Sequence, residues 1–430
     1  MKIGFISLGC SKNLTDTETM MGQVLKEHQL VNSMEQADIM VVNSCSFIDP
    51  SRQETIDTLN ELKDWKSANK KVVLTGCYVE EVKDRVFELY PFIDGVINMG
   101  AISKINQLIA EISTSKEHYL HYESSSNNFL TNDERFLATP KHYSYLKIGD
   151  GCDNCCSYCR IPILRGSAIY KNPIAVIEEA TILANKGVKE LILVAQDTTS
   201  YQWENNYNLV DLLKDLENIN KIEWIRLMYC YPDKISPQLI EQIKISKKIV
   251  KYIDMPIQHI NDTILDSMNR HSSRAQIVST INQLRQEIPE IKLRTTMLVG
   301  YPGETQEMFE ELYGFAKDTR FDHLGVFTYS NEVGTASFNM RGQVEDTVKE
   351  KRFHKLMSLQ KRISKDLNKQ YLGTELNVLI DNLEGGRRYF DAPDIDGFVR
   401  VLNVQRSDIG QLKKVRIRKS LEYDLIGDIV

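Results

Sequence analysis

The sequence predicts an α/β protein built from a doubly wound parallel α/β domain, a central partial (β/α) barrel and a small antiparallel β-barrel. The chain has 430 residues, too many for one ordinary hydrophobic core. Apolar strand-like runs alternate with amphipathic helix-like stretches up to about residue 370, a pattern typical of parallel sheets. Beyond it, short strand-like runs are separated by turns, which is typical of a small barrel. The expected parts are 1–116, a linker at 117–137, 138–366 and 367–430.

The first part alternates strands and helices. Strands are expected at 2–9, 37–45, 70–77 and 94–100, because each is a short, mostly apolar run. Helices are expected at 15–28, 51–65, 80–90 and 102–112, where apolar residues recur at helical spacing. The polar, aperiodic sequence that follows predicts the linker.

The central part repeats the alternation. Strands are expected at 143–150, 190–197, 221–229, 252–259, 292–303 and 323–330, with helical stretches such as 172–187 and 274–288 between them. Six such units predict an open or partial barrel related to the eight-fold one. A helix at 346–370 leads to the last part, whose strands are expected at 374–382, 397–404, 411–420 and 423–430.

Charge and hydropathy exclude some classes of protein. A net charge of -6 argues against a general nucleic-acid binder. No apolar run approaches the roughly 18 residues that a membrane helix needs, and the run Ile3 to Leu8 is too short for a signal peptide. We therefore expect a cytoplasmic protein, in which thiols stay reduced and clustered cysteines indicate metal binding or catalysis.

Three single cysteines occupy matching places. Cys10, Cys45 and Cys77 each follow a predicted strand of the first part, next to a small or flexible neighbour. The carboxyl ends of parallel strands share one edge of a sheet, so these thiols should meet there. A lone cysteine is usually an inert core residue. Three at matched strand ends favour a shared binding site instead.

The stretch "GCDNCCSYCR" (151–160) holds four of the eight cysteines. Paired C-x-x-C steps would suggest a structural zinc site, but here the pairs abut and can hardly surround one tetrahedral ion. The alternative partition uses Cys152, Cys156 and Cys159 as three thiolates for a 4Fe-4S cluster, leaving one iron open for reaction.

This spacing, C-x3-C-x2-C with Tyr158 before its last cysteine, resembles the signature of radical S-adenosylmethionine enzymes. "GYPGE" (300–304) resembles the later strand-end motif with which that superfamily binds the same cofactor. The resemblance implies that the three cysteines bind the cluster. It implies S-adenosylmethionine-binding roles for Tyr158, Gly300, Pro302, Gly303 and Glu304.

Two cysteines fall outside these sets. Cys155 is an extra thiol inside the loop, and we expect its small side chain to pack under the loop. Cys230, in "LMYCYP", is expected to belong to the core.

The whole chain resembles the methylthiotransferases, which join a three-cysteine domain, a radical core and a C-terminal TRAM barrel. "LGCSKN" (8–13), "NSCSFI" (43–48), "VAQDTTSY" (194–201) and "DAPDIDGFVRV" (391–401) resemble the branch that methylthiolates the β-carbon of an aspartate in ribosomal protein S twelve. The tRNA-modifying branch typically shows a "GCQMN"-like start and Asn where Asp197 stands.

The resemblance implies two 4Fe-4S clusters per chain, the second bound by Cys10, Cys45 and Cys77 and used as the source of sulfur. It implies that one electron, from a donor such as flavodoxin or ferredoxin, cleaves S-adenosylmethionine, and that the resulting radical removes hydrogen from the aspartate β-carbon. A second S-adenosylmethionine supplies the methyl group. Further residues are expected at strand ends on the barrel mouth without assigned roles: Gln196, Asp197, Arg226, Gln258 and His259, of which His259 could equally be a core residue.

Other functions remain open at this point. Within the enzymes, the alternative is a tRNA adenosine methylthiotransferase of the 2-methylthio-N6-isopentenyladenosine type. From residue 371 onward, nine Lys and Arg stand against ten Asp and Glu, a net charge of -1. We therefore expect no dedicated tRNA binding, and an acidic chain suits a ribosomal protein rich in Lys and Arg. An iron–sulfur carrier without catalysis and a zinc-stabilised binding protein are the remaining classes.

Overall fold

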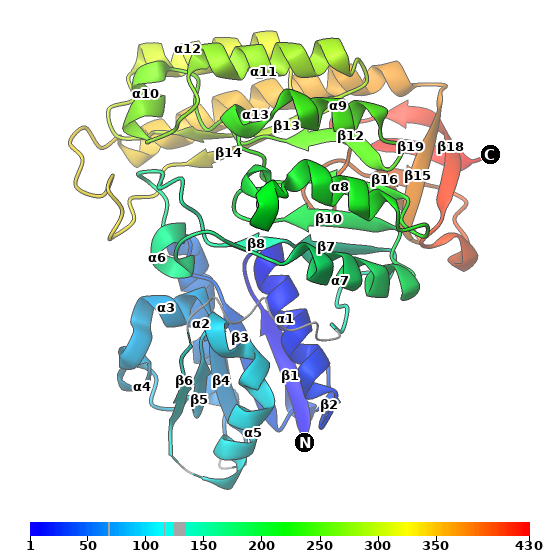
Figure 1. Cartoon of the computed structure of the whole chain (residues 1–430). Helices are drawn as coiled ribbons and strands as arrows, with labels where there is room; N and C mark the ends of the chain where they lie inside the picture. The colour runs from blue at the N-terminus through cyan, green and yellow to red at the C-terminus, as the bar shows by residue number, and fades with distance from the viewer. Residues whose placement is uncertain (68, 116, 124–134) are drawn as a thin grey trace.

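A computed structural model describes residues 1–67, 69–115, 117–123 and 135–430, and it contains the three expected parts (Figure 1). The N-terminal part is a six-stranded parallel sheet in the order β2-β1-β3-β4-β5-β6. Its strands are β1 (Lys2–Ser7), β2 (Gln29–Leu30), β3 (Ile39–Ser44), β4 (Lys71–Gly76), β5 (Gly95–Ile97) and β6 (Tyr119–His121). Its helices are α1 (Ser11–Val24), α2 (Asp49–Trp65), α3 (Cys77–Val82), α4 (Val86–Leu89) and α5 (Ile105–Thr114).

This sheet is buried on both faces, which confirms the doubly wound class. Every residue of β3 is buried. Side chains that alternate along it enter different clusters: Val41 packs with Met20 and Leu108 on one face, and Val42 packs with Leu59 on the other. Helices on both faces of a parallel sheet produce this pattern.

The structure contains two edge strands that the sequence did not predict, and it interrupts one predicted helix. β2 and β6 were missed because they are only two and three residues long. β6 lies inside the predicted linker, so part of that segment belongs to the N-terminal sheet, while its residues 124–134 lie outside the described part of the chain. The helix expected at 80–90 is interrupted where Lys83 takes a left-handed φ of 47°.

The central part is a six-stranded parallel sheet in the consecutive order β14-β13-β12-β11-β10-β7, an open partial barrel as predicted. Its strands are β7 (Tyr143–Lys147), β10 (Glu190–Val194), β11 (Trp224–Leu227), β12 (Ile249–Asp254), β13 (Lys292–Val299) and β14 (His323–Thr328). The helices are α6 (Ile161–Arg165), α7 (Pro173–Asn185), α8 (Leu209–Glu217), α9 (Pro237–Ile245), α10 (Asp262–Ser267), α11 (Arg274–Glu287), α12 (Gln306–Thr319) and α13 (Asp346–Asn368). A small hairpin, β8 (Gly149–Asp150) with β9 (Ile169–Tyr170), encloses the cysteine loop and α6.

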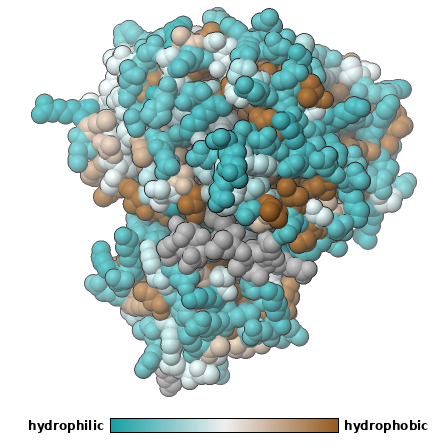
Figure 2. Space-filling view, viewed as in Figure 1, coloured by the Kyte–Doolittle hydropathy of each residue, from teal (hydrophilic) through white to brown (hydrophobic). Residues whose placement is uncertain are grey.

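Short 3-10 turns complete the described helices: Met34–Gln36, Lys83–Arg85, Met99–Lys104, Thr198–Ser200, Glu204–Asn206, Pro232–Lys234, Lys369–Tyr371 and Arg406–Asp408. Among the described helices, none combines the length and the hydrophobicity of a membrane span. The face of the molecule in Figure 2 is mainly hydrophilic, and its hydrophobic residues lie in small groups.

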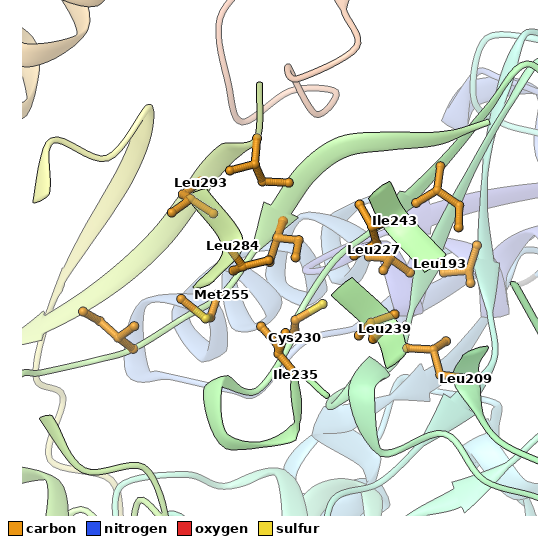
Figure 3. Close-up of a cluster of buried hydrophobic side chains, with 14 of the residues drawn as sticks. Leu193, Leu209, Leu227, Cys230, Ile235, Leu239, Ile243, Met255, Leu284 and Leu293 are labelled. Atoms are coloured by element: carbon orange, nitrogen blue, oxygen red, sulfur yellow. The ribbon is translucent and has the colours of Figure 1, made fainter. Parts of the chain in front are cut away.

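The largest core lies between the central sheet and its outer helices. Cys230 is buried in this core, and Figure 3 shows it among Ile235, Leu239 and Met255. Its thiol is therefore a packing group, because a free cysteine in an apolar core behaves as a small hydrophobic residue. The prediction that Cys230 belongs to the core is confirmed.

The C-terminal part is a closed five-stranded barrel in the order β15-β16-β17-β19-β18. Its strands are β15 (Glu375–Asn382), β16 (Gly385–Arg388), β17 (Val399–Val401), β18 (Leu412–Ser420) and β19 (Leu425–Ile429). All strand pairs are antiparallel except β17 with β19, which is parallel. The sequence missed β16 because "GGRR" suggests a turn, although the close approach of β15 requires a glycine at position 386.

This barrel covers the amino ends of the central strands. Leu379 and Phe390 pack with Tyr143 and Trp224 at the beginnings of β7 and β11. Figure 1 places the barrel beside the central sheet and away from the N-terminal domain. The carboxyl ends of the central strands, where such folds bind ligands, are thus left for other contacts.

Arg226 belongs to this buried junction and not to the barrel mouth, so its predicted position was wrong. It lies inside β11 with no exposed surface, and its Nε donates to Glu190 Oε1 at 2.7 Å. Arg387 of the C-terminal barrel donates to the other oxygen of Glu190 at 2.7 Å. The three side chains form a buried ionic bridge between the two domains.

A second ionic group joins the N-terminal domain to the central one. Arg135 donates to Glu18 of α1 and to Glu179 of α7. Glu179 also pairs with Lys171. These charges are almost completely withdrawn from solvent, so each depends on its partners.

We expect this group to make the fold sensitive to acid. Burial opposes ionisation of Glu179, but Lys171 and Arg135 outweigh it and lower its pKa from 4.5 to about 2. A depressed carboxylate pKa contributes stability that is present above pH 4.5 and lost as the pH falls toward 2, here about 3 kcal/mol. The free energy of unfolding of Glu179→Gln should therefore lie below that of the wild type at pH 6, and this difference should shrink between pH 4.5 and 3. A difference independent of pH would contradict the pairing.

Candidate functional site

The three single cysteines meet at one edge of the N-terminal sheet, as the sequence predicts. Cys45 and Cys77 directly follow β3 and β4, and Cys10 follows β1 after two loop residues. These three strands are neighbours in the sheet. A Cβ atom on Gly9 would lie 2.7 Å from the Cys45 sulfur, so only glycine allows this approach. We call Cys10, Cys45 and Cys77 the second triad.

The electrostatic environment differs among these three thiols. Burial raises the pKa of Cys77 to about 11 and also raises the pKa of Cys45. Burial opposes ionisation of Cys10 too, but the charges of Lys12 and Arg165 outweigh it and lower the pKa of Cys10. Thiolates are the form that binds metals, so ligand binding at this triad releases protons and is assisted by these two cations.

The cysteine loop after β8 holds the first triad, Cys152, Cys156 and Cys159. Cys159 Sγ accepts a hydrogen bond from the backbone N–H of Ile161 at 3.4 Å, and burial raises the pKa of Cys159 to about 12, with the neighbouring thiols adding to the rise. Cys156 Sγ lies 3.5 Å from the Tyr231 hydroxyl and 3.9 Å from Arg270. Such donors stabilise coordinated thiolates.

Cys155 differs from its neighbours in the loop by its backbone conformation and its exposure. Its φ of 48° is left-handed, its side chain is exposed, and its carbonyl accepts from Asn269 Nδ2 at 3.0 Å. The expectation that Cys155 packs under the loop was therefore wrong. In the described residues no three His, Cys, Asp or Glu side chains surround one ion position. The three thiolates of a four-iron cluster bind different irons and need not share one ion position.

The adjacent Cys155 and Cys156 give a matched pair of variants. After anaerobic reconstitution, Cys156→Ala should lose about four irons per chain, while Cys155→Ala should keep the wild-type iron content. Iron and acid-labile sulfide analysis measures both variants. Equal iron loss in the two variants would contradict the C-x3-C-x2-C assignment.

The "GYPGE" loop begins directly after β13 and is fastened to the cysteine loop. The Ser157 hydroxyl lies 2.7 Å from the hydroxyl of Tyr301, which donates to the Ser267 carbonyl at 2.7 Å. Tyr158 packs edge-on against Tyr301, with ring centroids 6.5 Å apart, in a cluster that also contains Met268. The two motifs quoted from the sequence are therefore neighbours in space.

Glu304 supports this loop from within the protein. Its carboxylate accepts from the backbone N–H of Gly300, and its Oε2 lies 3.3 Å from Arg352. Its Oε1 lies 3.7 Å from His259 Nε2, and neither atom has a hydrogen-bond partner among the described residues. Gly300 and Gly303 both have positive φ angles. Pro302 is buried between these glycines.

Asp197 positions the cysteine loop from the end of β10. It accepts from Asn154 at 2.7 Å and from Lys234 at 2.8 Å. Burial would raise the pKa of Asp197, but hydrogen bonds from Lys234, Thr199 and Asn154 lower it. These residues line an open pocket of about 460 Å³ beside Cys152.

The remaining strand-end residues occupy the same mouth. Gln196 donates to Asp150 at 2.6 Å, and its Oε1 is buried without a partner in the described structure. Gln258 is half-buried with a left-handed φ of 68°. Buried polar atoms without partners, here Gln196 Oε1 and Arg270 Nε, fit a site that a polar ligand completes.

Helix α6 connects the two triads, and sequence reasoning missed it. It begins two residues after Cys159, and its Leu164 packs against Cys77 of the second triad. A five-residue helix is about 7 Å long, so one short element joins Cys159 to the residue that packs against Cys77. Five residues make little more than one helical turn, so the apolar residues of α6 cannot show a helical repeat in the sequence.

Arg165 at the end of α6 completes the junction. It donates to Asp150 at 2.7 Å, to Asp16 of α1 at 3.1 Å, and also to Asn13. Lys147 pairs with both aspartates as well. The pairs with Asn13 and Asp16 join residues that are far apart in sequence, so they could be found only from the structure.

Three family profiles match the chain. The profile described as "Uncharacterized protein family UPF0004" matches residues 2–98, the Radical SAM superfamily matches 146–316, and the TRAM domain matches 372–430. "Ribosomal protein uS12 methylthiotransferase RimO" of Clostridium botulinum is 41% identical over 434 residues, covering 99% of this chain and 97% of that protein. The protein of the same name from Dictyoglomus thermophilum is 43% identical and covers 100% of both chains.

Solved structures show a similar fold. The radical S-adenosylmethionine methyltransferase TsrM from Kitasatospora setae has a TM-score of 0.58 at 12% identity, covering 89% of this chain and 79% of that one. The cobalamin-dependent radical enzyme OxsB has a TM-score of 0.52 at 12% identity, covering 85% and 56%. At this identity the likeness concerns the fold alone.

Proposed function

The chain belongs to the RimO family of ribosomal protein uS12 methylthiotransferases, and we propose that it adds a methylthio group to the β-carbon of an aspartate in uS12. It is a radical S-adenosylmethionine transferase, and this superfamily uses S-adenosylmethionine with a 4Fe-4S cluster. The observation that carries the proposal is the presence of two cysteine triads connected by α6, within a full-length match to RimO proteins.

Two clusters per chain form the finer part of this proposal. The first triad would hold one 4Fe-4S cluster and the second triad another, and the all-sulfur donor set fits both. Three thiolates for four irons leave one iron of each cluster without a protein ligand. When bound, these groups supply radical cleavage of a C–H bond that no side chain can break, and a source of sulfur. A donor such as flavodoxin or ferredoxin would supply the electron.

The protein's own residues hold these parts in place. Asp197, Lys234 and Asn154 fix one side of the cysteine loop to β10, and the Ser157–Tyr301 hydrogen bond fixes its other side to the "GYPGE" loop. Residues locked by such contacts keep a reacting geometry that flexible loops would lose. We retain the S-adenosylmethionine-binding roles of Tyr158 and of the "GYPGE" loop as part of the proposal.

The C-terminal barrel supports a protein substrate over tRNA. In its basic strand β18, Lys413 pairs with Asp408, Arg416 with Glu375, and Arg418 with Asp428. Two further cations of the barrel, Arg387 and Arg388, are buried in ion pairs. Phosphate contacts dominate RNA affinity, so the pairing of these five of the nine barrel cations reduces the charge that the barrel offers to tRNA.

A competition experiment tests the proposed substrate. The reconstituted protein is given S-adenosylmethionine, a reductant, a peptide from the aspartate-containing loop of uS12 and isopentenyladenosine-containing tRNA. Mass spectrometry should find one added CH2S unit on the peptide aspartate and none on the tRNA. Gain by the tRNA alone would contradict the proposed substrate while leaving the methylthiotransferase chemistry in place.

A further inference from the structure

Lys12 is a buried cation that no carboxylate of the described residues pairs with. It lies two residues after Cys10, near the start of α1, and only 7% of its surface is exposed. Its ammonium lies 4.0 Å from the ring centroid of Tyr229. Among the described residues the ammonium makes no hydrogen bond or ion pair, although its charge helps to lower the pKa of Cys10. An ammonium with no carboxylate beside it favours an anionic ligand, so an anion is expected to join it in the working complex.

The carboxylates nearest to Lys12 are already occupied. Asp150 pairs with Arg165 at 2.7 Å and with Lys147 at 3.2 Å. Asp16 pairs with the same two cations. Three cations thus stand against two carboxylates, and the unmatched positive charge is that of Lys12.

Lys12 lies where the two domains meet, beside the second triad. Lys12 comes from the N-terminal domain, two residues after Cys10. Tyr229 comes from the central domain, two residues after β11, at the carboxyl edge of that sheet. Its backbone is held in a left-handed conformation, φ 58°, by a hydrogen bond from its N–H to Asp254 at 2.9 Å. The ammonium therefore lies between a triad and a fixed aromatic ring.

We propose that the Lys12 ammonium binds the side-chain carboxylate of the aspartate that receives the methylthio group. This inference rests on the proposed function. The carboxylate is bonded directly to the β-carbon, so one ion pair at this point both neutralises the substrate and fixes the orientation of the reacting carbon. A lysine is suited to this role, because its ammonium is a compact charge with three donors. Lys12 is thus a substrate-specificity residue.

The test compares two peptides on one enzyme. The reconstituted protein binds fluorescently labelled uS12-loop peptides that carry either aspartate or asparagine at the target position, and anisotropy gives each Kd. A charged hydrogen bond contributes about 1.5–3 kcal/mol, so the wild type should prefer aspartate by roughly tenfold to a hundredfold. Lys12→Met should bind both peptides with nearly equal Kd, and the iron content of each protein is measured alongside.

Lys70 provides a matched control. It also lies over an aromatic ring, 4.3 Å from Trp65, but at the opposite end of its domain's strands from the triads. Lys70→Met should keep the wild-type preference for aspartate. If Lys12→Met does not fold, Lys12→Gln provides the same comparison, because both Kd values are measured on one protein.

The outcomes separate this inference from the function on which it rests. If the wild type binds and modifies the aspartate peptide but Lys12→Met keeps the same preference, the inference is overturned and the function stands. If Lys12→Met loses iron while keeping its preference, Lys12 serves the cluster and not the substrate. If the wild type neither binds nor modifies the peptide, both are overturned.

Discussion

Replacing the second triad with alanine is expected to abolish methylthio transfer while preserving S-adenosylmethionine cleavage. Replacing the first triad is expected to abolish both. The reason is that each triad belongs to a different domain, and each domain has its own hydrophobic clusters. Loss of one triad should therefore leave the other domain and its cluster folded.

Two triple variants measure this separation. Each should contain about half of the wild-type iron, about four instead of eight atoms per chain. Formation of 5′-deoxyadenosine should stay within a few-fold of the wild type in Cys10→Ala/Cys45→Ala/Cys77→Ala, and the modified peptide should fall below detection. In Cys152→Ala/Cys156→Ala/Cys159→Ala, both products should be undetectable. Full transfer activity without the second triad would contradict its role as the source of sulfur.

Replacing Arg165 with methionine is expected to weaken the junction between the domains by about 3–5 kcal/mol. The change would leave Asp16 and Asp150 short of one cation in a buried site, and breaking a buried pair by removing one partner is strongly destabilising. We expect lower unfolding free energy and faster proteolysis between the N-terminal and central domains.

A variant of an exposed arginine serves as the control for Arg165→Met. Arg85 lies 3.9 Å from Glu88 on the surface of the N-terminal domain, and Arg85→Met should cost less than about 1 kcal/mol. Urea unfolding of the three proteins gives the comparison. If Arg165→Met unfolds within about 1 kcal/mol of the wild type, the ionic junction does not hold the domains together.

Much of the fold and the two triads could be predicted from the sequence, because they follow from local patterns. Apolar runs identify strands, and the carboxyl ends of parallel strands share an edge, so the positions of Cys10, Cys45 and Cys77 along the chain already imply that they meet. The four cysteines of the loop allow several partitions, and the resemblance to the radical S-adenosylmethionine signature singled out Cys152, Cys156 and Cys159. Cluster binding by these six cysteines stays a prediction.

The residues that the sequence did not reveal act through contacts between distant segments. Asp16 and Arg165 are separated by 149 residues, and nothing local in either sequence indicates their pairing. Arg226 was expected at the barrel mouth because its strand ends there. In the structure Arg226 is instead buried with Glu190 at the junction between the central domain and the C-terminal barrel. The side chain of Cys155 was predicted in the wrong position because the sequence gives no indication that a non-glycine residue will adopt a left-handed φ.

The mass of uS12 from living cells tests the central claim most directly. A bacterial strain that lacks its own RimO is complemented with this chain, and uS12 from its ribosomes is digested and analysed by mass spectrometry. The account predicts one CH2S unit on the target aspartate with the wild-type chain and none with either triad replaced. Unmodified uS12 from cells that produce the iron-loaded wild-type chain would contradict it.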